Sequence, residues 1–138
     1  MAGYRLELAP DIAEIPRLID WVESRCGEAA VSGDVSCKLA LALEEAAVNA
    51  IHHAFVGVSA PHRIEVTLSI DAERIRAELI DNGRAFDPSN APDADVSLPL
   101  ERRDPGGLGI RLIRRMADRV DYRRVAGENR LLLEKSRG

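Results

Sequence analysis

Two consecutive segments, residues 64–70 and 75–81, constrain the fold of this 138-residue chain more than any other feature. Apolar residues occupy every second position of both segments, namely Ile64, Val66, Leu68 and Ile70, then Ile75, Ala77 and Leu79. Such alternation predicts two half-buried strands, and the short Asp-Ala-Glu connection between them predicts an antiparallel hairpin. A sheet with one apolar face must bury that face against a second layer.

The other periodic segments of the chain supply the rest of the sheet and the second layer. Helical spacing of apolar residues predicts three helices, over residues 11–29, 35–55 and 108–117. A Ser-Gly-Asp sequence at 32–34 is typical of a helix cap before the second one. Alternation predicts three more strands, over residues 4–9, 120–125 and 129–135. This order predicts an α/β (α+β) two-layer sandwich, in which a mostly antiparallel mixed sheet carries the helices on one face.

Composition and charge narrow the class of protein. A chain of 138 residues with 46% hydrophobic content fits one domain, residues 1–138. The net charge is −4 and no basic run exceeds two residues, which argues against nucleic-acid or membrane partners. Neither a signal peptide nor a membrane-spanning run of about 20 apolar residues is visible, so we expect a cytoplasmic protein. The two cysteines, Cys26 and Cys37, fit reduced packing thiols.

Between residues 84 and 107 the composition changes to proline, aspartate, serine and asparagine. Four of the chain's seven prolines fall here. Long ordered loops of this kind usually cover a functional site, so the segment is predicted to be a lid.

The second predicted helix carries a polar stripe. At 100° per residue, five polar residues fall within an arc of about 100°: Lys38, Glu45, Asn49, His52 and His53. Glu45 and Asn49 are four positions apart, so their side chains are neighbours. Their oxygens could bind one hard cation, or the carboxylate could accept a proton. The alternative is an ordinary solvated helix face.

A carboxylate continues the apolar face of the predicted hairpin. Counting on by two from Leu79 reaches Asp81, which therefore points into the apolar layer. A buried carboxylate needs hydrogen-bond donors. These are either the turn amides of the Asp-Asn-Gly sequence or a ligand group such as an exocyclic amine. Gly83 would let a flat ring approach the backbone closely.

The third predicted helix begins at a glycine-rich sequence. "DPGGLGI", residues 104–110, has three glycines in four positions at the helix start. Exposed backbone amides at a positive helix end can hold a phosphate, although a glycine cluster can also be a flexible hinge. Two arginines of the lid, Arg102 and Arg103, precede it and favour the phosphate reading.

Together these motifs resemble the GHKL ATPase superfamily, and most closely its anti-sigma-factor serine/threonine kinase branch. "LALEEAAVNAIHHAF" is similar to that branch's N-box, "LIDNGRAFDP" to its first glycine box and "GGLGIRLIRRMADRV" to its second. The resemblance covers nearly the whole chain. It implies a histidine-kinase-like ATPase domain with the Bergerat ATP-binding fold and a lid at about residues 84–107.

The resemblance also implies roles for residues of the N-box and the first glycine box. Glu45 matches the general base for a protein hydroxyl, and Asn49 matches the Mg²⁺ ligand. Asp81 matches the acid that accepts the adenine amino group, with Gly83 beneath the ring. His53 matches a residue near the adenine and the lid edge.

Further matches lie outside those two boxes. Gly107, Leu108 and Gly109 match the second glycine box, which binds the ATP phosphates. Arg102 and Arg103 replace the threonine and lysine of some relatives' lids, so which of them contacts the terminal phosphate stays open. Arg17 lies where the family presents an arginine to protein partners. The last predicted strand lacks the threonine that often supports the adenine-binding acid, so the hydrogen-bond partners of Asp81 are not predicted.

The resemblance implies a kinase that binds ATP and Mg²⁺, sequesters a sigma factor and phosphorylates a small STAS-type anti-sigma antagonist. One alternative is a nucleotide-binding module that acts by partner exchange alone. Another is the catalytic fragment of a histidine kinase, which would need a phosphoacceptor helix pair that these 138 residues do not contain. Whether a homodimer forms through the first strand and helix is left open.

Overall fold

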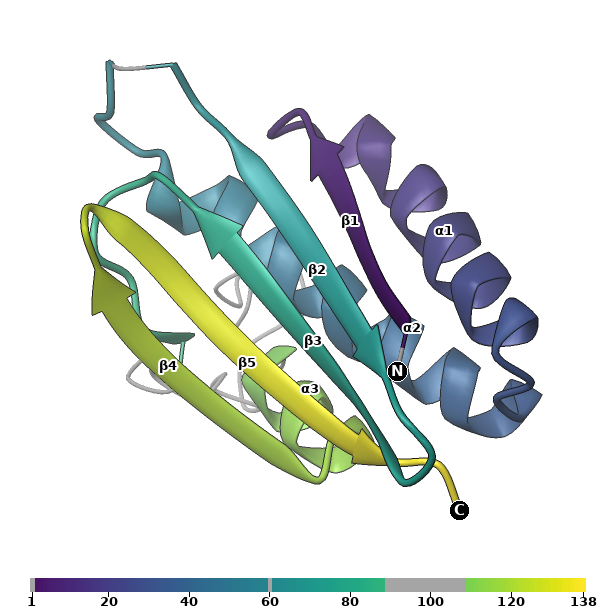
Figure 1. Ribbon diagram of the computed structural model, residues 1–138. Helices are drawn as coiled ribbons and strands as arrows, with labels where there is room; N and C mark the ends of the chain where they lie inside the picture. The colour runs from purple at the N-terminus through teal and green to yellow at the C-terminus, as the bar shows by residue number, and fades with distance from the viewer. Residues whose placement is uncertain (1, 60, 89–108) are drawn as a thin grey trace, which may run out of the picture.

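The computed structural model describes residues 2–59, 61–88 and 109–138. Five strands form one sheet in the order β1-β2-β3-β5-β4, and Figure 1 shows α2 and α3 behind it, with α1 beside β1 at the right. The elements in chain order are β1 (Ala2–Leu8), η1 (Ile12–Glu14), α1 (Ile15–Glu28), α2 (Gly33–Asn49), η2 (Ala50–Ala54), β2 (Ile64–Ile70), β3 (Arg74–Asp81), α3 (Gly109–Met116), β4 (Arg119–Val125) and β5 (Glu128–Ser136). The predicted two-layer sandwich is confirmed.

The sheet differs from the prediction in one respect, since it is not mixed. All four pairings between the described strands are antiparallel. The β2–β3 and β4–β5 pairs are hairpins, and β5 pairs with β3 as well as β4. This register places Asp81 of β3 directly opposite Asn129 of β5.

The predicted second helix is split into two kinds of helix. Ser32 caps its start, where the Ser32 hydroxyl accepts a hydrogen bond from Val35 N at 3.3 Å. After Asn49 the α-helix widens into a single π-helical turn, η2. The chain beyond β3 closes this end, because Arg84 N donates to the carbonyl of Ala54 at 2.7 Å. Such π turns are frequent at functional sites.

The hydrophobic core lies between the helices and the inner face of the sheet. It includes Leu18 and Val22 of α1, Leu39 and Leu43 of α2 and Ile113 of α3, all fully buried. Six alanines of α2 and η2 are also buried: Ala40, Ala42, Ala46, Ala47, Ala50 and Ala54. Their small side chains let the helix backbone come close to the sheet and to the cavity described below.

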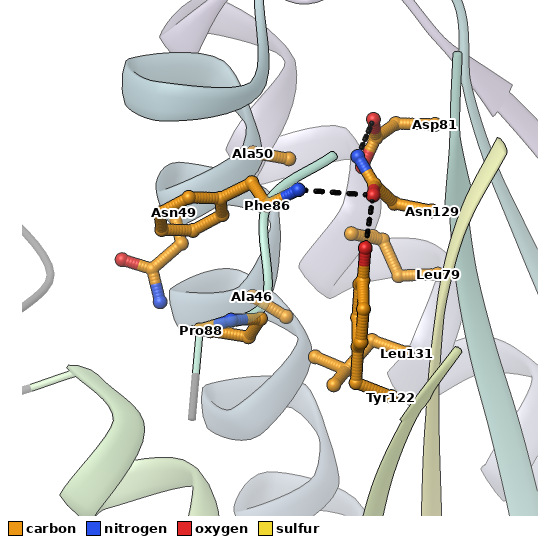
Figure 2. A pocket seen from close by; sticks show the side chains of 10 residues that line it. All are labelled: Ala46, Asn49, Ala50, Leu79, Asp81, Phe86, Pro88, Tyr122, Asn129 and Leu131. Atoms are coloured by element: carbon orange, nitrogen blue, oxygen red, sulfur yellow. Dashed lines mark hydrogen bonds between the residues drawn. The ribbon is translucent and has the colours of Figure 1, made fainter. Parts of the chain in front are cut away.

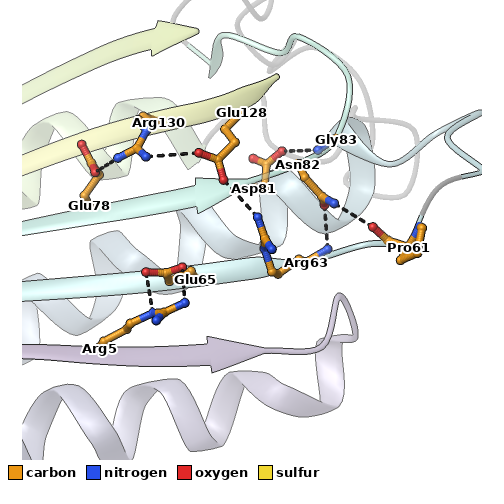
Figure 3. A network of polar contacts seen from close by, with 10 residues as sticks. All are labelled: Arg5, Pro61, Arg63, Glu65, Glu78, Asp81, Asn82, Gly83, Glu128 and Arg130. Atoms are coloured by element: carbon orange, nitrogen blue, oxygen red, sulfur yellow. Dashed lines mark hydrogen bonds and ion pairs between the residues drawn. The ribbon is translucent and has the colours of Figure 1, made fainter. Parts of the chain in front are cut away.

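The outer face of the sheet is polar and open to solvent. Cross-strand ion pairs cover it, including Arg5 with Glu65 at 2.7 Å and Arg130 with Glu78 at 2.8 Å (Figure 3). Exposed ion pairs add little stability. Their effect here is to keep this face hydrophilic. Among the described residues, no helix is long and apolar enough to cross a bilayer.

Candidate active site

A small cavity lies between α2 and the inner face of β3, β4 and β5 (Figure 2). Its lining includes Ala46, Asn49, Asp81, Phe86, Tyr122 and Asn129. The space left inside is about 20 Å³, enough for roughly one water molecule. Phe86 and Pro88, from the segment after β3, form one of its walls. This space is too small for a flat aromatic ligand unless some of the lining residues move.

Asp81 lines the cavity and is 4% exposed. Its Oδ1 accepts hydrogen bonds from Gly83 N at 2.9 Å and from Asn129 Nδ2 at 2.8 Å. One donor is thus the turn amide that the sequence suggested. Within the described ranges neither hydrogen bond reaches Oδ2, so this oxygen can accept one from a ligand. Burial raises the pKa of the Asp81 carboxyl, while the bonds from Asn129 and Gly83 lower it.

Asn129 is a site residue that the sequence analysis missed. It is 3% exposed, and its side chain holds the site together through both ends of its amide. Nδ2 donates to Asp81 Oδ1 at 2.8 Å and to Arg84 O at 2.7 Å. Oδ1 accepts from the Tyr122 hydroxyl at 2.6 Å, Phe86 N at 3.1 Å and Arg124 Nη1 at 3.1 Å. Asn129 therefore fixes the acid and the wall of the cavity at once.

The signal for Asn129 was present in the sequence. Leu133 and Leu131 are buried on the inner face of β5, and counting back by two reaches Asn129. This is the same alternation that identified Asp81 on β3. The missing threonine drew attention away from it, although an asparagine amide can donate to a carboxylate equally well.

Gly83 has a structural reason to be glycine. A Cβ at this position would lie 2.4 Å from the carbonyl oxygen of Ala54, at the end of η2. Any larger residue would push the β3 end away from the helix. Its expected place beneath a flat ring remains a prediction.

The polar stripe of the second helix divides into residues with different surroundings. Asn49 is 3% exposed and lines the cavity, and its Nδ2 has no hydrogen-bond partner in the described part of the chain. Glu45, one turn earlier, is half-buried; burial, and then the neighbouring Glu44 carboxylate, raise its pKa. His52 is exposed, and Lys38 forms an ion pair with Asp34 at 3.1 Å. Of these four residues, Asn49 alone lines the cavity.

His53 lies at the edge of the cavity, on η2. Its ring stacks on Phe86, with centroids 4.9 Å apart and an interplanar angle of 20°. The His53 carbonyl also accepts a hydrogen bond from Arg84 Nε at 3.0 Å. These contacts attach η2 to the first residues of the predicted lid.

Other candidate residues lie elsewhere. Arg17 is on α1, where it forms an ion pair with Glu14 at 3.2 Å and donates to the Glu7 carbonyl at 2.8 Å. Its side chain is still 52% exposed. Gly109 is the first residue of α3. Four residues of the lid and the second glycine box fall outside the described residues: Arg102, Arg103, Gly107 and Leu108.

Comparison with known proteins decides the family. The sequence model of the histidine kinase-like ATPase domain matches residues 8–135. The chain belongs to this family. The resemblance to the GHKL superfamily is therefore confirmed, and ATP is the ligand class for which such a domain is built.

This histidine kinase-like ATPase domain is similar to a serine/threonine-protein kinase in sequence and to an RsbW domain in fold. The serine/threonine-protein kinase BtrW of Bordetella bronchiseptica is 30% identical over 128 residues, which cover 93% of this chain and 89% of BtrW. A structure of the RsbU and RsbW domains of Rv1364c from Mycobacterium tuberculosis has a TM-score of 0.70 at 15% identity. That likeness covers 100% of this chain and 34% of the other, and it shows the fold.

A third comparison shows how widely the fold is shared. The histidine kinase domain of the blue-light activated histidine kinase EL346 from Erythrobacter litoralis has a TM-score of 0.58 at 16% identity. The match covers 91% of this chain and 60% of that protein. The fold alone thus does not separate histidine kinases from serine/threonine kinases, and the activity has to be argued from the site.

Proposed function

We propose that this ATPase-family protein is an ATP-dependent serine/threonine kinase that acts as an anti-sigma factor. The observation that carries the proposal is that Asn49 and Asp81 line one cavity, while Glu45 lies next to Asn49 on the same helix. The buried Asp81 offers an acceptor for the adenine amino group. Asn49 lies at the cavity wall, and Glu45 lies one helical turn before it on α2.

Glu45 is suited to accept the proton of a hydroxyl. Its pKa is raised by burial and by the Glu44 carboxylate. A general base works best when its pKa lies near the working pH. In the proposed step the acceptor hydroxyl oxygen bonds to the γ-phosphorus of ATP and its proton passes to Glu45. The bond from the γ-phosphorus to the bridging oxygen breaks, and ADP leaves.

The residues of the site fit Mg²⁺ held by few protein ligands. No group of three His, Cys, Asp or Glu side chains in the described ranges could hold a metal ion. Asn49 instead offers a buried amide whose Nδ2 has no partner in those ranges, and a rotation of the amide would place its oxygen there. Mg²⁺ commonly takes one or two protein oxygens together with phosphates and water. When bound, it would neutralise the charge that develops on the phosphates.

The remaining phosphate contacts of the proposal lie at the start of α3 and in the lid. Gly109 begins α3, whose N-terminal amides could hold a phosphate. Gly107, Leu108, Arg102 and Arg103 are proposed to complete this part of the site. His53, stacked on Phe86 at the cavity edge, is proposed to contact the nucleotide or the lid.

The proposed partners are a sigma factor and a STAS-type antagonist. The serine/threonine kinase relative and the RsbW-domain fold support this proposal. Arg17, half-exposed on α1 and held by Glu14 and the Glu7 carbonyl, would present its guanidinium to a partner protein in a fixed position. A homodimer is a further proposal that rests on the resemblance alone.

Transfer of labelled γ-phosphate to a purified STAS-type antagonist tests the proposal. Wild-type protein should phosphorylate one serine or threonine, and Glu45→Gln should abolish transfer while ATP still binds. Glu44→Gln is the matched control, because it removes an adjacent carboxylate without removing the base. If ATP and antagonist both bind but no phosphate is transferred, the protein is a partner-exchange module.

A further inference from the structure

The solvent-facing side of α2 carries an exposed leucine beside Glu45. Leu41 is 38% exposed, whereas the next two residues, Ala42 and Leu43, are completely buried. A single exposed leucine is common on protein surfaces. Its position is what matters here, because residues four apart on a helix have Cβ atoms about 6 Å apart.

Glu45 stands on the border between the cavity and this exposed side. At 100° per residue, Leu41 and Val48 lie roughly 40° and 60° from Glu45 around the helix axis on one side. Asn49 lies about 40° away on the other side, and Ala46 follows it. Asn49 and Ala46 both line the cavity. A nucleotide bound in the cavity would therefore meet Glu45 from one side and leave Leu41 and Val48 uncovered.

The two apolar residues flank the carboxylate along the helix. Leu41 comes one turn before Glu45 and Val48 about one turn after it. Val48 is partly buried against the core, so Leu41 is the more exposed of the two. Farther out the side of the helix becomes polar, with the Lys38–Asp34 ion pair at one end and the exposed His52 at the other. We call Leu41, Glu45 and Val48 the α2 strip.

We infer that the α2 strip is the docking surface for the protein segment that carries the acceptor hydroxyl, and that this segment has an apolar side chain beside the acceptor. The inference rests on the proposed kinase function. The acceptor oxygen must come within about 3 Å of Glu45. Because Leu41 lies only one turn away, a polypeptide that reaches Glu45 from solvent must also cover it. An apolar neighbour gains by burying the Leu41 side chain, and a charged one does not.

Kinetics with a purified STAS-type antagonist as acceptor test this inference. Leu41→Gln keeps a good helix former of similar size and removes the apolar surface. We expect the KM for the antagonist to rise about tenfold, which corresponds to the loss of a partly exposed leucine side chain from an interface. The kcat and the Kd for ATP should stay as in the wild type. Leu41→Met, which keeps an apolar side chain, should have the same KM as the wild type. Val125→Gln, at a 42% exposed apolar position on β4, is the matched control and should change nothing.

The outcomes separate this inference from the proposed function. If the wild type transfers phosphate and Leu41→Gln leaves the KM unchanged, the docking surface is wrong and the kinase proposal stands. If the wild type transfers none, the kinase proposal is wrong, and calorimetric binding of the same antagonist decides the surface. A complex weakened by Leu41→Gln and restored by Leu41→Met supports it. Equal affinity, or no complex with the wild type, overturns it.

Discussion

Asn129 Nδ2 lies 2.8 Å from Asp81 Oδ1, and the two residues face each other across the β3–β5 pair. Both are almost fully buried, at 3% and 4% exposure. The contact fixes which carboxylate oxygen is taken by the protein, so that Oδ2 can serve a ligand. Because the same asparagine accepts a hydrogen bond from Phe86 N at 3.1 Å, it contacts both the acid and the cavity wall.

Asn129→Ala should therefore weaken both stability and ATP binding. The substitution leaves the Tyr122 hydroxyl and the Phe86 amide without their acceptor, at a cost of about 1–3 kcal/mol in the free energy of unfolding. The loss of orientation at Asp81 should raise the Kd for ATP roughly tenfold. Urea denaturation and calorimetry measure the two effects. Tyr122→Phe, which removes one donor to Asn129, should affect ATP binding much less; equal losses in the two variants would contradict a special role for Asn129.

Asp81→Asn should raise stability at neutral pH while it weakens ATP binding by roughly tenfold or more. Burial raises the pKa of Asp81 in the folded protein, so the folded state binds this proton more tightly than the unfolded chain does. Folding stability then falls as the pH rises from the unfolded value of about 3.9 toward the raised value. Asparagine does not ionise, so its advantage appears over that window and persists above it. Thermal unfolding of both proteins at a series of pH values from about 3 to about 8, a range that begins below the unfolded pKa, measures this difference in stability.

The pKa of Asp71 is shifted in the opposite direction, so Asp71→Asn is the control for that experiment. Its pKa is lowered by hydrogen bonds from the backbone amides of Arg74 and then Glu73. The charged form is therefore favoured by folding, and its stabilising effect is lost as the pH falls through the lowered pKa. Asp71→Asn should destabilise the protein at neutral pH and match it at strongly acidic pH. The same pH trend in both variants would show that burial does not set the pKa of Asp81.

Glu44 should influence the pH dependence of phosphate transfer through its effect on Glu45. The Glu44 carboxylate contributes to the raised pKa of Glu45, after burial. Glu44→Gln removes that repulsion, so the Glu45 carboxylate stays ionised to lower pH. The acid limb of the rate profile should shift toward lower pH while the plateau changes little. Glu23→Gln, an exposed acid on α1, should leave the profile in place. An unmoved limb in Glu44→Gln would mean that Glu45 is not the group whose ionisation limits the rate.

Much of the fold could be predicted from the sequence because its strands and helices depend on local periodicity. The β2–β3 hairpin and the Ser32 cap are contacts between residues close in sequence. The same counting that placed Asp81 on the inner face would also have found Asn129. The pairing of β5 with β3 is a contact between distant segments, which periodicity does not specify.

The surroundings of the polar stripe could not be read from the helix alone. Asn49 and His52 fall within the same arc, yet one is buried and the other exposed. The difference arises because the segment after β3 packs along one side of α2, where Phe86 and Pro88 line the cavity with Asn49. The π turn depends equally on that segment, since Arg84 N bonds to the Ala54 carbonyl. These contacts join residues about 30 positions apart and leave no periodic signal.

Gly83→Ala tests whether this junction, rather than a ligand, requires glycine. The added Cβ would lie 2.4 Å from the Ala54 carbonyl oxygen, so the end of β3 or η2 must shift. We expect a loss of about 1–3 kcal/mol in the free energy of unfolding without any nucleotide present. Gly27→Ala on α1 meets no atom within 4 Å and should instead add about 0.5–1 kcal/mol. If Gly83→Ala unfolds like the wild type and only loses ATP affinity, the glycine serves the ligand and not the junction.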